Sequence, residues 1–477
     1  MNKLPFDALL TNYILELDKT NIVLSNDNIS IINFIKKRFL EVVKSFLWNQ
    51  YVFEKHLINS GIFEVKEVYK CAIERVSNKF NSIDDLPDVL KFKLLNIYKD
   101  TYHYLSTIIS KFEKDKNEIK GLLNLSKSIE IKKILFLGDP HNGCQSVVRL
   151  TIEDDIFLMY KPNEIRLSWF VKESLKNFEQ LFLFPKQIIK EEYYWEEYIS
   201  YSKANNSLVD VSTGLGVLSG FAQMCCFSDL HYENLIIHNN KIVIFDFETI
   251  FDFKISTFDK LISVSGEKIK FGETPLISSI LPTWFEGVYG GYGNLSFIGG
   301  PTYLNYKHKT FDNVESNNMT FGLVQKKSSN IKEIDSSLFI NGYTKAIEEI
   351  DCFNAYKIKE SEFILRRKVY RSTKEYWHII DMLSSKVDVD LLSILKYKKV
   401  PKKIIELELT TISRNIDIPY FVEKIDSKSI EEELVRAKKR AVENIRLNIS
   451  IIKTALLSQN YSFSKVQDLL LNYEYNL

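Results

Sequence analysis

Two aspartates and one asparagine in the middle of the chain have the types and the spacing that phosphoryl transfer requires. Asp229 precedes Asn234 by five positions, and Asp246 ends an apolar run after a hairpin-like stretch. In kinases a catalytic-loop carboxylate accepts the proton of the attacking hydroxyl and precedes a magnesium-binding asparagine by five positions, and a further carboxylate completes the metal site. We therefore predict that Asp229 is the base and that Asn234 and Asp246 bind Mg²⁺ on the phosphates of ATP.

Each of these residues also has an ordinary structural interpretation. Asp229 and Asn234 could cap turns, and Asp246 could end a buried strand. We favour the metal site because an aspartate directly after the apolar residues 242–245 is costly to bury without a partner or a metal. His231 would either orient the base or substrate or hold the loop by hydrogen bonds, and we predict the catalytic role.

A nucleotide site also needs a cation for the phosphates, usually a lysine on a strand of the small lobe. Lys161 follows the strand-like run 156–160 and stands in the right place in chain order, although a surface lysine is the alternative. No Gly-x-Gly-x-x-Gly precedes it. The turn-rich segment 138–143 occupies that region, and its Asp139 and His141 indicate a role beyond phosphate cradling.

The third cluster is basic and covers residues 366–373. Arg367 and Arg371 are four positions apart, so a helix there would place both on one side. Forked guanidinium groups on one face suit a phosphate. Taken alone, such a cluster is more often a solvated helix face.

Several elements must position these groups, and their pattern predicts an α+β fold. We expect a kinase-like two-lobed core, with a small β-rich lobe and a helical large lobe, and an added N-terminal helical region. The strand runs are 134–137, 147–152, 156–162 and the hairpin 235–237 with 242–245, and the helical segments are 1–128 with a break at 78–87, 167–185, 191–204, 214–227, 339–350, 361–383 and 429–457.

The same patterns predict four regions. They are a helical N-terminal region for capping or peptide docking at 1–128, a kinase-like core with the nucleotide and catalytic motifs at 129–254, a Gly/Ser/Asn-rich insert of long loops at 255–330, and a helical C-terminal lobe with the Arg/Thr motif at 331–477. A disordered insert is the alternative for the third region.

The bulk composition excludes some classes of protein. Lys and Arg total 63 against 62 for Asp and Glu, so no global field favours nucleic acid. No apolar run approaches the roughly 20 residues of a membrane span. The five cysteines form no disulfide framework. We expect a cytoplasmic protein that has no nucleic-acid partner.

At this point a group of motifs, taken together and in this order, resembles the dehydratase domain of class II lanthipeptide synthetases. Asp-x-His-x-x-Asn alone is shared with relatives of aminoglycoside and choline kinases, so the resemblance depends on the whole set. The motifs are Gly138-Asp139-x-His141-Asn142-x-x-x-Ser146-Val147, Tyr160-Lys161-Pro162, Trp195-Glu196-Glu197-Tyr198, Asp229-Leu230-His231-x-Glu233-Asn234-Leu235-Ile236, Asp246-x-Glu248-Thr249, Arg367-x-x-x-Arg371-x-Thr373-x-x-Tyr376 and Asp417-Ile418-Pro419-Tyr420-Phe421.

The resemblance implies a two-step reaction on a precursor peptide that carries a leader segment. ATP would phosphorylate a Ser or Thr, and the same enzyme would eliminate the phosphate to leave dehydroalanine or dehydrobutyrine. Elimination needs a base for the α-proton and cationic help for the departing phosphate. The resemblance assigns nucleotide, magnesium and phosphoryl transfer to Lys161, Asp229, His231, Asn234, Asp246 and Glu248, and elimination to Asp139, His141, Arg367 and Thr373.

The chain also departs from that family. Full-length members carry a C-terminal cyclase whose zinc uses Cys and His ligands, but no Cys follows Cys352 here. We therefore expect no zinc and no in-chain thioether formation, and a stand-alone dehydratase that works alone or with a separate cyclase. Asn163 stands where the family usually has Arg, and Gln145 stands at a position that is usually basic. Contacts to the substrate or nucleotide at these two positions therefore differ from those of the family, whereas the core set of residues is intact.

Two other functions fit part of the pattern. A kinase that only phosphorylates a small molecule or a protein hydroxyl would keep Asp229, Asn234 and Asp246 but give no catalytic duty to the elimination residues. A degenerate kinase-like module would bind a peptide or nucleotide without catalysis, and the intact set of two aspartates and one asparagine argues against it.

Overall fold

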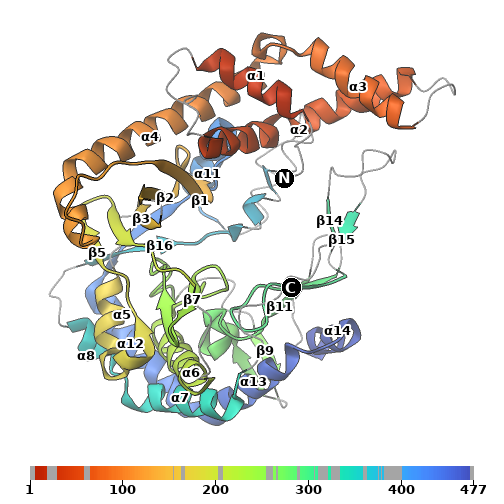
Figure 1. The fold of residues 1–477 in the computed structure, drawn as a ribbon. Coiled ribbons are helices and arrows are strands. Elements are labelled where there is room, and N and C mark those ends of the chain that lie inside the picture. Colours follow the sequence, from red (N-terminus) through yellow and green to blue (C-terminus); the bar gives the residue numbers. More distant parts are fainter. Residues whose placement is uncertain are drawn as a thin grey trace.

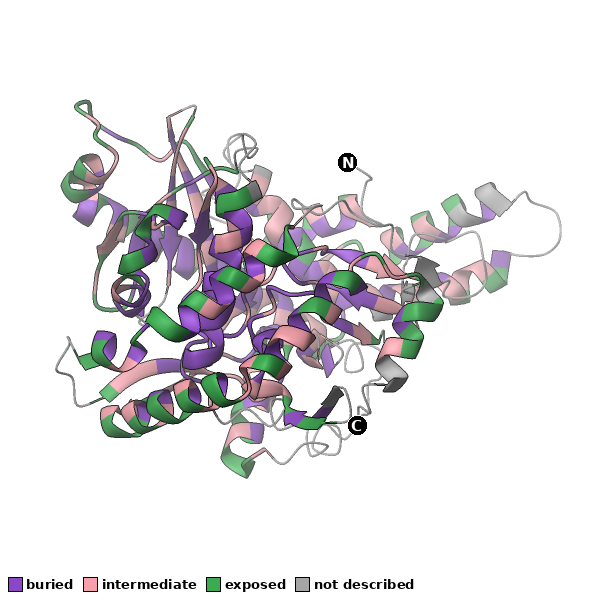
Figure 2. Ribbon diagram, turned by 90° about the horizontal axis from the view of Figure 1, so that it is seen from below, coloured by how far each residue is buried: buried purple, intermediate pink, exposed green. Residues whose placement is uncertain are grey.

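The computed structural model combines helices with several small sheets, which confirms the predicted mixed α+β composition (Figure 1). Buried residues form two hydrophobic clusters, one joining the N-terminal helices to the largest sheet and the other lying among the later helices. Figure 2 shows buried residues in the interior and exposed residues on the outer faces of helices. The described residues are 6–18, 29–58, 65–153, 155–162, 167–201, 208–253, 261–264, 267–286, 291–305, 307–309, 321–323, 334–357, 363–373, 375–377, 379–380 and 400–472.

The described part of the N-terminal region is helical, as its apolar spacing predicts. Ile35, Phe39 and Val43 recur at four-residue intervals and are buried. Phe34 stacks on Phe136 of the sheet with ring centroids 4.1 Å apart, so the second helix packs directly on the sheet. The elements are α1 Asp7–Leu17, α2 Ile29–Ile58, α3 Val65–Lys79, the 3-10 turn η1 Ile83–Asp85 at the predicted break, and α4 Asp88–Leu122.

An antiparallel sheet of five strands follows, in the order β1-β2-β3-β6-β5. The three predicted strand runs lie in β1, β2 and β3, and β2 and β3 pair as the predicted hairpin, whose Asp154 lies outside the described residues. This sheet carries Lys161 at the end of its third strand. The strands are β1 Lys133–His141, β2 Gln145–Glu153, β3 Ile156–Lys161, β5 Gln187–Ile189 and β6 Tyr194–Glu197.

The segment 138–143 was predicted as a turn-rich loop, and this is wrong for most of it. Strand β1 continues to His141, and its register with β2 shifts between Leu137 and His141. Gly138 has a φ of 73°, which costs a glycine little, so the strand can become irregular there and still continue.

The predicted helix at 191–204 is also wrong, because β6 lies inside it. This strand is paired on both sides, with β3 and with β5, and it buries Trp195 completely. Aromatic residues fit a pleated sheet well, and the pairing with distant strands outweighs a local helical pattern. Residues 202–204 lie outside the described residues.

The second hydrophobic cluster, among the later helices, is built around α6, which is buried along most of its length. A methyl group on Gly216 would lie 2.0 Å from the carbonyl oxygen of Phe339 in α7, so these two helices are in very close contact. The predicted helices 214–227, 339–350 and 429–457 correspond to α6, to α7 and to α12 with α13. The elements are α5 Ser168–Ser174, the 3-10 turn η2 Lys176–Leu181, β4 Phe182–Leu183, α6 Leu208–Cys225, α7 Ser336–Glu349, α8 Cys352–Lys357, α12 Ser427–Glu443, α13 Ile445–Ser458 and α14 Phe463–Asn472.

The predicted catalytic hairpin is confirmed. Leu235–His238 forms β7, which pairs antiparallel with β8, Lys241–Ile244, and β4 adds a parallel strand to the other edge of β8. The segment 167–185, predicted as helical, holds α5 and η2 and then continues into β4. No helix among the described residues is both long and apolar enough to cross a bilayer.

The Gly-rich segment 255–330 is not built only of long loops, because its described residues form short antiparallel pairings. Neighbouring short runs pair in register, as in a hairpin. The strands are β9 Leu261–Val264, β10 Glu267–Lys270, β11 Trp284–Glu286, β12 Tyr292–Asn294, β13 Thr302–Leu304, β14 Lys307–Lys309 and β15 Phe321–Leu323, with the 3-10 turns η4 Phe271–Glu273 and η5 Pro275–Ser278.

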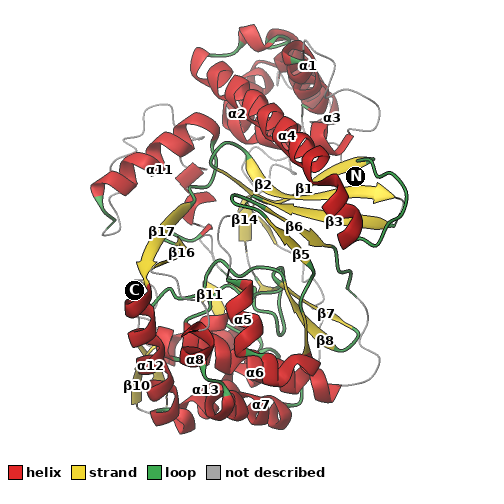
Figure 3. Ribbon diagram, turned by 90° about the vertical axis from the view of Figure 1, so that its left-hand side faces the viewer, coloured by secondary structure: helices red, strands yellow, loops and turns green. Residues whose placement is uncertain are grey.

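The predicted helix at 361–383 is wrong in its first part, because Phe363–Lys368 is strand β16. It pairs antiparallel with β17, Phe421–Asp426, which is more than fifty residues further along the chain and just after α11, Lys402–Asn415. A pairing at this separation leaves no trace in local periodicity. Figure 3 shows β16 and β17 beside the region where the five-stranded sheet faces the helices of the second hydrophobic cluster. Residues 381–383 lie outside the described residues.

The contact between α6 and α7 predicts that Gly216→Ala destabilises the protein. The added methyl would overlap the backbone of α7, and such overpacking typically costs about 1–3 kcal/mol in unfolding free energy. Gly121→Ala in α4 is a matched control, since its methyl would meet no atom within 4 Å and alanine favours a helix by up to about 1 kcal/mol. Denaturant unfolding of both variants checks this, and equal midpoints for the two would contradict the predicted contact.

Candidate active site

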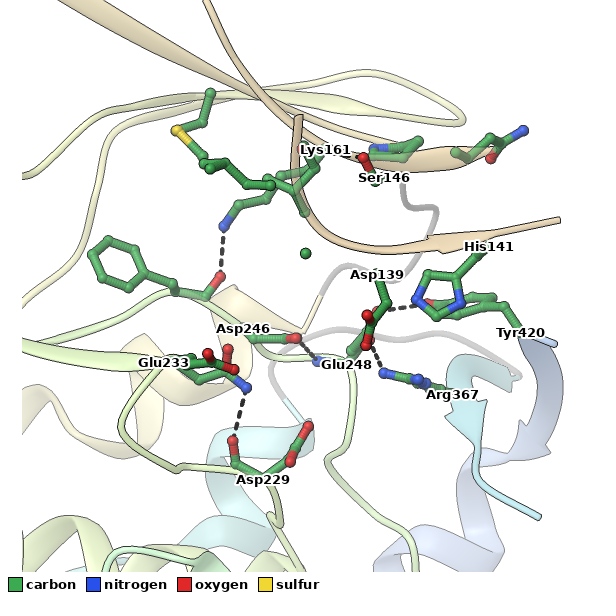
Figure 4. Close-up of a pocket in the computed structure, with 18 of the residues that line it drawn as sticks. Asp139, His141, Ser146, Lys161, Asp229, Glu233, Asp246, Glu248, Arg367 and Tyr420 are labelled. Atoms are coloured by element: carbon green, nitrogen blue, oxygen red, sulfur yellow. Dashed lines mark hydrogen bonds and ion pairs between the residues drawn. The ribbon is translucent and has the colours of Figure 1, made fainter. Parts of the chain in front are cut away.

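One cavity of about 590 Å³ is lined by residues that are distant from one another in the sequence. Its lining comes from β1, β2, β3 and β6 of the sheet, from the loops around the β7–β8 hairpin, and from β16, Thr373 and the segment before β17. Figure 4 shows several of these side chains pointing toward the same space. The cavity brings together all ten residues predicted for the site: Asp139, His141, Lys161, Asp229, His231, Asn234, Asp246, Glu248, Arg367 and Thr373.

Lys161 is buried, so the alternative of a surface lysine does not hold. Its Nζ lies 2.6 Å from Glu196 Oε1 and donates to the carbonyl oxygen of Phe245, also at 2.6 Å. Glu196 on β6 is fully buried, and its other oxygen accepts a hydrogen bond from Gln187 Nε2 at 2.7 Å. The ammonium group of Lys161 is therefore held next to Phe245, the residue directly before Asp246.

The loop before β7 holds Asp229, His231 and Asn234 through its own hydrogen bonds. Asn234 Nδ2 donates to the carbonyl oxygen of Asp229 at 2.9 Å, which orients the amide and leaves its oxygen as the atom that can bind a metal. Asp229 has a φ of 68°, a left-handed conformation that is uncommon for residues other than glycine. Aspartate adopts this conformation more readily than most residues other than glycine.

His231 contacts the predicted base directly. The backbone N–H of Glu233 donates to His231 Nδ1, so the ring carries its proton on Nε2, which lies 3.3 Å from Asp229 Oδ1. Burial would raise the pKa of Asp229, but the hydrogen bond from His231 and the charge of Arg367 outweigh burial and hold it below its ordinary value. Asp229 is therefore ionised at neutral pH, as a base must be.

Asp246 lies at the end of β8 among other carboxylates. Its Oδ1 accepts the backbone N–H of Glu248 at 2.9 Å. Burial first, and then the negative charges of Glu248 and Asp229, raise the pKa of Asp246 to about 7. This part of the cavity therefore has an excess of negative charge, which a cation would relieve.

Asn234 and Asp246 could hold Mg²⁺ together with the phosphates of a nucleotide. Carboxylate and amide oxygens from Asp246 and Asn234 are suitable donors, and Mg²⁺ is usually held by one or two carboxylates together with substrate phosphates. Among the described residues, no group of three or more His, Cys, Asp or Glu side chains is arranged to hold a metal ion by itself.

Arg367 lies on the other side of Glu248. Arg367 Nη1 is 2.5 Å from Glu248 Oε1, and Tyr420 donates its hydroxyl hydrogen to Glu248 Oε2 at 2.6 Å. The guanidinium group also lies over the Tyr420 ring, 5.1 Å from its centroid. Figure 4 shows Arg367 and Tyr420 meeting at Glu248.

The prediction that Arg367 and Arg371 share one face is wrong. Arg367 is in strand β16, whereas Arg371 follows the strand and is buried elsewhere, with its Nε 2.9 Å from Glu408 Oε1 on α11. Because β16 ends at Lys368, the four-residue spacing of a helix does not apply. Thr373 begins the next helical segment and lines the cavity.

His141 faces the same side of the cavity as Arg367. Its Nδ1 lies 2.9 Å from the carbonyl oxygen of Ile418, which can only accept, so Nδ1 carries the proton. Burial and the positive charge of Arg367 lower the pKa of His141 below its ordinary value, so the ring is neutral at neutral pH. Nε2 is therefore an unprotonated nitrogen that could accept a proton. Asp139 lines the cavity close in sequence to it.

Glu196 and Tyr420 were quoted in the sequence motifs without a role, and the structure places both in the cavity lining. Glu196 pairs with Lys161, and Tyr420 pairs with Glu248. The available signal was an acidic residue directly after the aromatic residues of a strand, and a tyrosine after a proline in the last motif. Neither signal identifies a partner, because both partners are distant in sequence.

Comparison with known proteins places the chain in a family. Residues 88–424, more than half of the chain, match the family described as "Domain of unknown function (DUF4135)". The chain is also 23% identical to the lacticin 481/lactococcin biosynthesis protein LcnDR2 of Lactococcus lactis subsp. lactis, over an alignment of 447 residues that covers 80% of this chain and 47% of that protein. The chain thus spans about half the length of the curated relative it matches. The chain belongs to the DUF4135 family, which is found in lanthipeptide synthetases, and the resemblance to their dehydratase domain is thereby confirmed.

Proposed function

We propose that the protein is an ATP-dependent dehydratase of Ser and Thr residues in a precursor peptide. The observation that carries the proposal is that one cavity holds two chemically different sets of groups. One set is rich in carboxylates and includes a buried lysine, and the other combines an arginine, a tyrosine and a neutral histidine. The membership of the chain in a family found in lanthipeptide synthetases supports the same substrate class.

We infer a kinase-like two-lobed core for the first step. In support, the lysine lies on the third strand of the sheet, and the Asp/Asn loop and the final aspartate flank the β7–β8 hairpin, as in kinases. The four regions 1–128, 129–254, 255–330 and 331–477 remain a proposed division. Residues 1–128 are the proposed docking region for a leader segment.

The first step would be phosphoryl transfer from ATP to a peptide hydroxyl. Asp229 accepts the hydroxyl proton, His231 keeps this carboxylate ionised and oriented, and Lys161 binds phosphate oxygens. Asn234 and Asp246 would hold Mg²⁺, which would neutralise the phosphates when it is bound.

The second step would be elimination of the phosphate. The base removes the α-proton, the Cβ–O bond breaks, and the bonding electrons leave with the phosphate. His141 has an unprotonated Nε2 for the proton, and Arg367 has the positive charge for the leaving group. Asp139 and Thr373 line the same side of the site and would assist this step. The protein would work alone or with a separate cyclase that acts on the dehydrated product.

The alternative is a kinase that stops at phosphorylation. In that case the Arg367–Glu248 ion pair would be only a structural link between β16 and the segment after β8. The products of the reaction separate the two proposals directly.

We expect that the protein, given ATP, Mg²⁺ and its cognate peptide, yields a peptide that has lost water at Ser or Thr. Mass spectrometry of the peptide checks this. A product that only gains phosphate would support the kinase alternative, and an unchanged peptide with no ATP consumed would rule out both enzymatic proposals.

The two sets of groups should separate by mutation. Asp229→Ala should yield unmodified peptide, because the base of the first step is lost, with a rate reduction of roughly 10²–10⁴-fold. Arg367→Ala and His141→Ala should accumulate phosphopeptide, because only the second step is impaired. Mass spectrometry over a time course measures both, and identical product patterns for the three variants would refute this division of roles.

Glu196→Gln tests the phosphate-binding role of Lys161. The neutral amide would leave the buried ammonium group without its carboxylate partner and able to move away from the phosphates. A hydrogen bond to a charged group contributes about 1.5–3 kcal/mol, so we expect the KM for ATP to rise roughly 10- to 100-fold. Steady-state kinetics measure this. Gln187→Ala, which removes the neutral donor to Glu196 together with the acceptor of the Ser168 hydroxyl, is the control and should change the KM much less.

A further inference from the structure

The side of the cavity that carries His141 is held by a buried ion pair from two distant parts of the chain. Arg38 Nη2 on α2 lies 2.5 Å from Asp417 Oδ1, and the two side chains are 3% and 0% exposed. The other oxygen of Asp417 accepts the backbone N–H groups of Gly143 at 2.7 Å and Cys144 at 2.9 Å. One carboxylate therefore connects an N-terminal helix to the turn directly after His141.

Arg38 also fixes the end of α11, just before Asp417. It donates to the carbonyl oxygens of Asn415 at 2.6 Å and Ile416 at 3.3 Å. Ile416 has a φ of 53°, a left-handed conformation that is strained for a β-branched residue. The rigid fork of a guanidinium group can bind all three acceptors at once, whereas a lysine ammonium is a single point charge on a flexible stem.

A second N-terminal helix holds the same short segment. Asp100 of α4 pairs with Arg414 at 3.0 Å and accepts a hydrogen bond from Asn415 Nδ2 at 2.5 Å. Two helices outside the cavity therefore determine the position of residues 414–417. Neither helix contributes a residue to the cavity lining.

The residues that follow this segment contact the cavity residues directly. The backbone N–H of Ile418 donates to the carbonyl oxygen of Pro140 at 3.0 Å, and the carbonyl oxygen of Ile418 faces His141 Nδ1 at 2.9 Å. Asn142 Nδ2 donates to the backbone carbonyl oxygen of Tyr420 at 3.0 Å. A shift of the 417–420 backbone would therefore move both the acceptor that fixes the His141 tautomer and the tyrosine that binds Glu248.

We propose that Arg38 and Asp417 are positioning residues for the elimination step. They hold the 140–144 turn against the 418–420 segment, so that His141 keeps its proton on Nδ1 and its basic Nε2 in place. The N-terminal helices thus form part of the elimination machinery, in addition to any role in peptide docking. This inference rests on the proposed two-step function, and it concerns the second step alone.

The test measures the two steps separately in the full-length protein. Phosphorylation is followed with unmodified peptide and ATP, and elimination with a chemically phosphorylated peptide, Mg²⁺ and saturating ADP, which keeps the nucleotide site filled. Asp417→Asn and Arg38→Met should slow elimination roughly 10- to 100-fold, because misplacement by about 1 Å can have such an effect. Phosphorylation should change much less, so phosphopeptide should accumulate.

Asp115→Asn is the matched control for a general loss of stability. Asp115 is another buried carboxylate of the N-terminal helices, and its partners are Trp195, Tyr193 and Lys190, none of which belongs to the 140–144 turn. Thermal unfolding is measured for every variant. If Asp417→Asn slowed both steps equally, or if Asp115→Asn also accumulated phosphopeptide at a matched melting temperature, the positioning role would be refuted.

Two further measurements give a decision if a variant does not fold or if no activity is found. Arg38→Lys keeps the charge but not the fork, so elimination should be partly lost, and wild-type elimination would overturn the proposal. Nitrogen-15 NMR of the seven histidines should show His141, identified with the His141→Ala variant, protonated on Nδ1, and Arg38→Lys should disturb that signal. An undisturbed signal overturns the proposal. Inactivity of the wild-type protein on both peptides would instead refute the proposed function.

Discussion

The carboxylate of Glu248 is the group that joins the two halves of the site. One of its oxygens pairs with Arg367 and the other accepts the hydroxyl hydrogen of Tyr420, while its backbone N–H binds Asp246. A largely buried carboxylate loses its hydration and needs such partners. The Glu248 side chain binds Arg367 and Tyr420, and its backbone binds Asp246. Glu248 therefore holds the carboxylate-rich half of the cavity at a fixed distance from the half that contains Arg367.

Because buried charged groups need partners of opposite charge, several of the charged groups around this cavity occur in pairs. Three ion pairs lie in its walls or close to them: Lys161 with Glu196 and Arg38 with Asp417 are buried, and Arg367 with Glu248 is largely buried. Buried ion pairs are weak evidence for stability, because well-packed apolar residues often stabilise a fold equally well. Two of these pairs, Lys161 with Glu196 and Arg367 with Glu248, lie in the lining of one cavity, which favours a functional explanation for them, in which fixed charges are held ready for phosphate chemistry.

Much of the local structure could be predicted from the sequence. The helices α2 and α7 follow from apolar residues at helical spacing, and the β7–β8 hairpin follows from two apolar runs around a polar turn. The errors occurred where a distant partner decided the structure. Strand β6 is formed because β3 and β5 lie on both of its sides, and β16 because β17 pairs with it.

The sequence by itself determined which chemical groups are available and the spacing within each short motif, such as the five positions between Asp229 and Asn234. The tertiary structure alone decided which groups meet. Arg367 contacts Glu248 from 119 residues away, and Arg38 contacts Asp417 from 379 residues away. Local periodicity reports which face of an element is buried, but it carries no information about which distant element covers that face. The motifs could therefore be read from the sequence, whereas their assembly into one cavity depends on the fold.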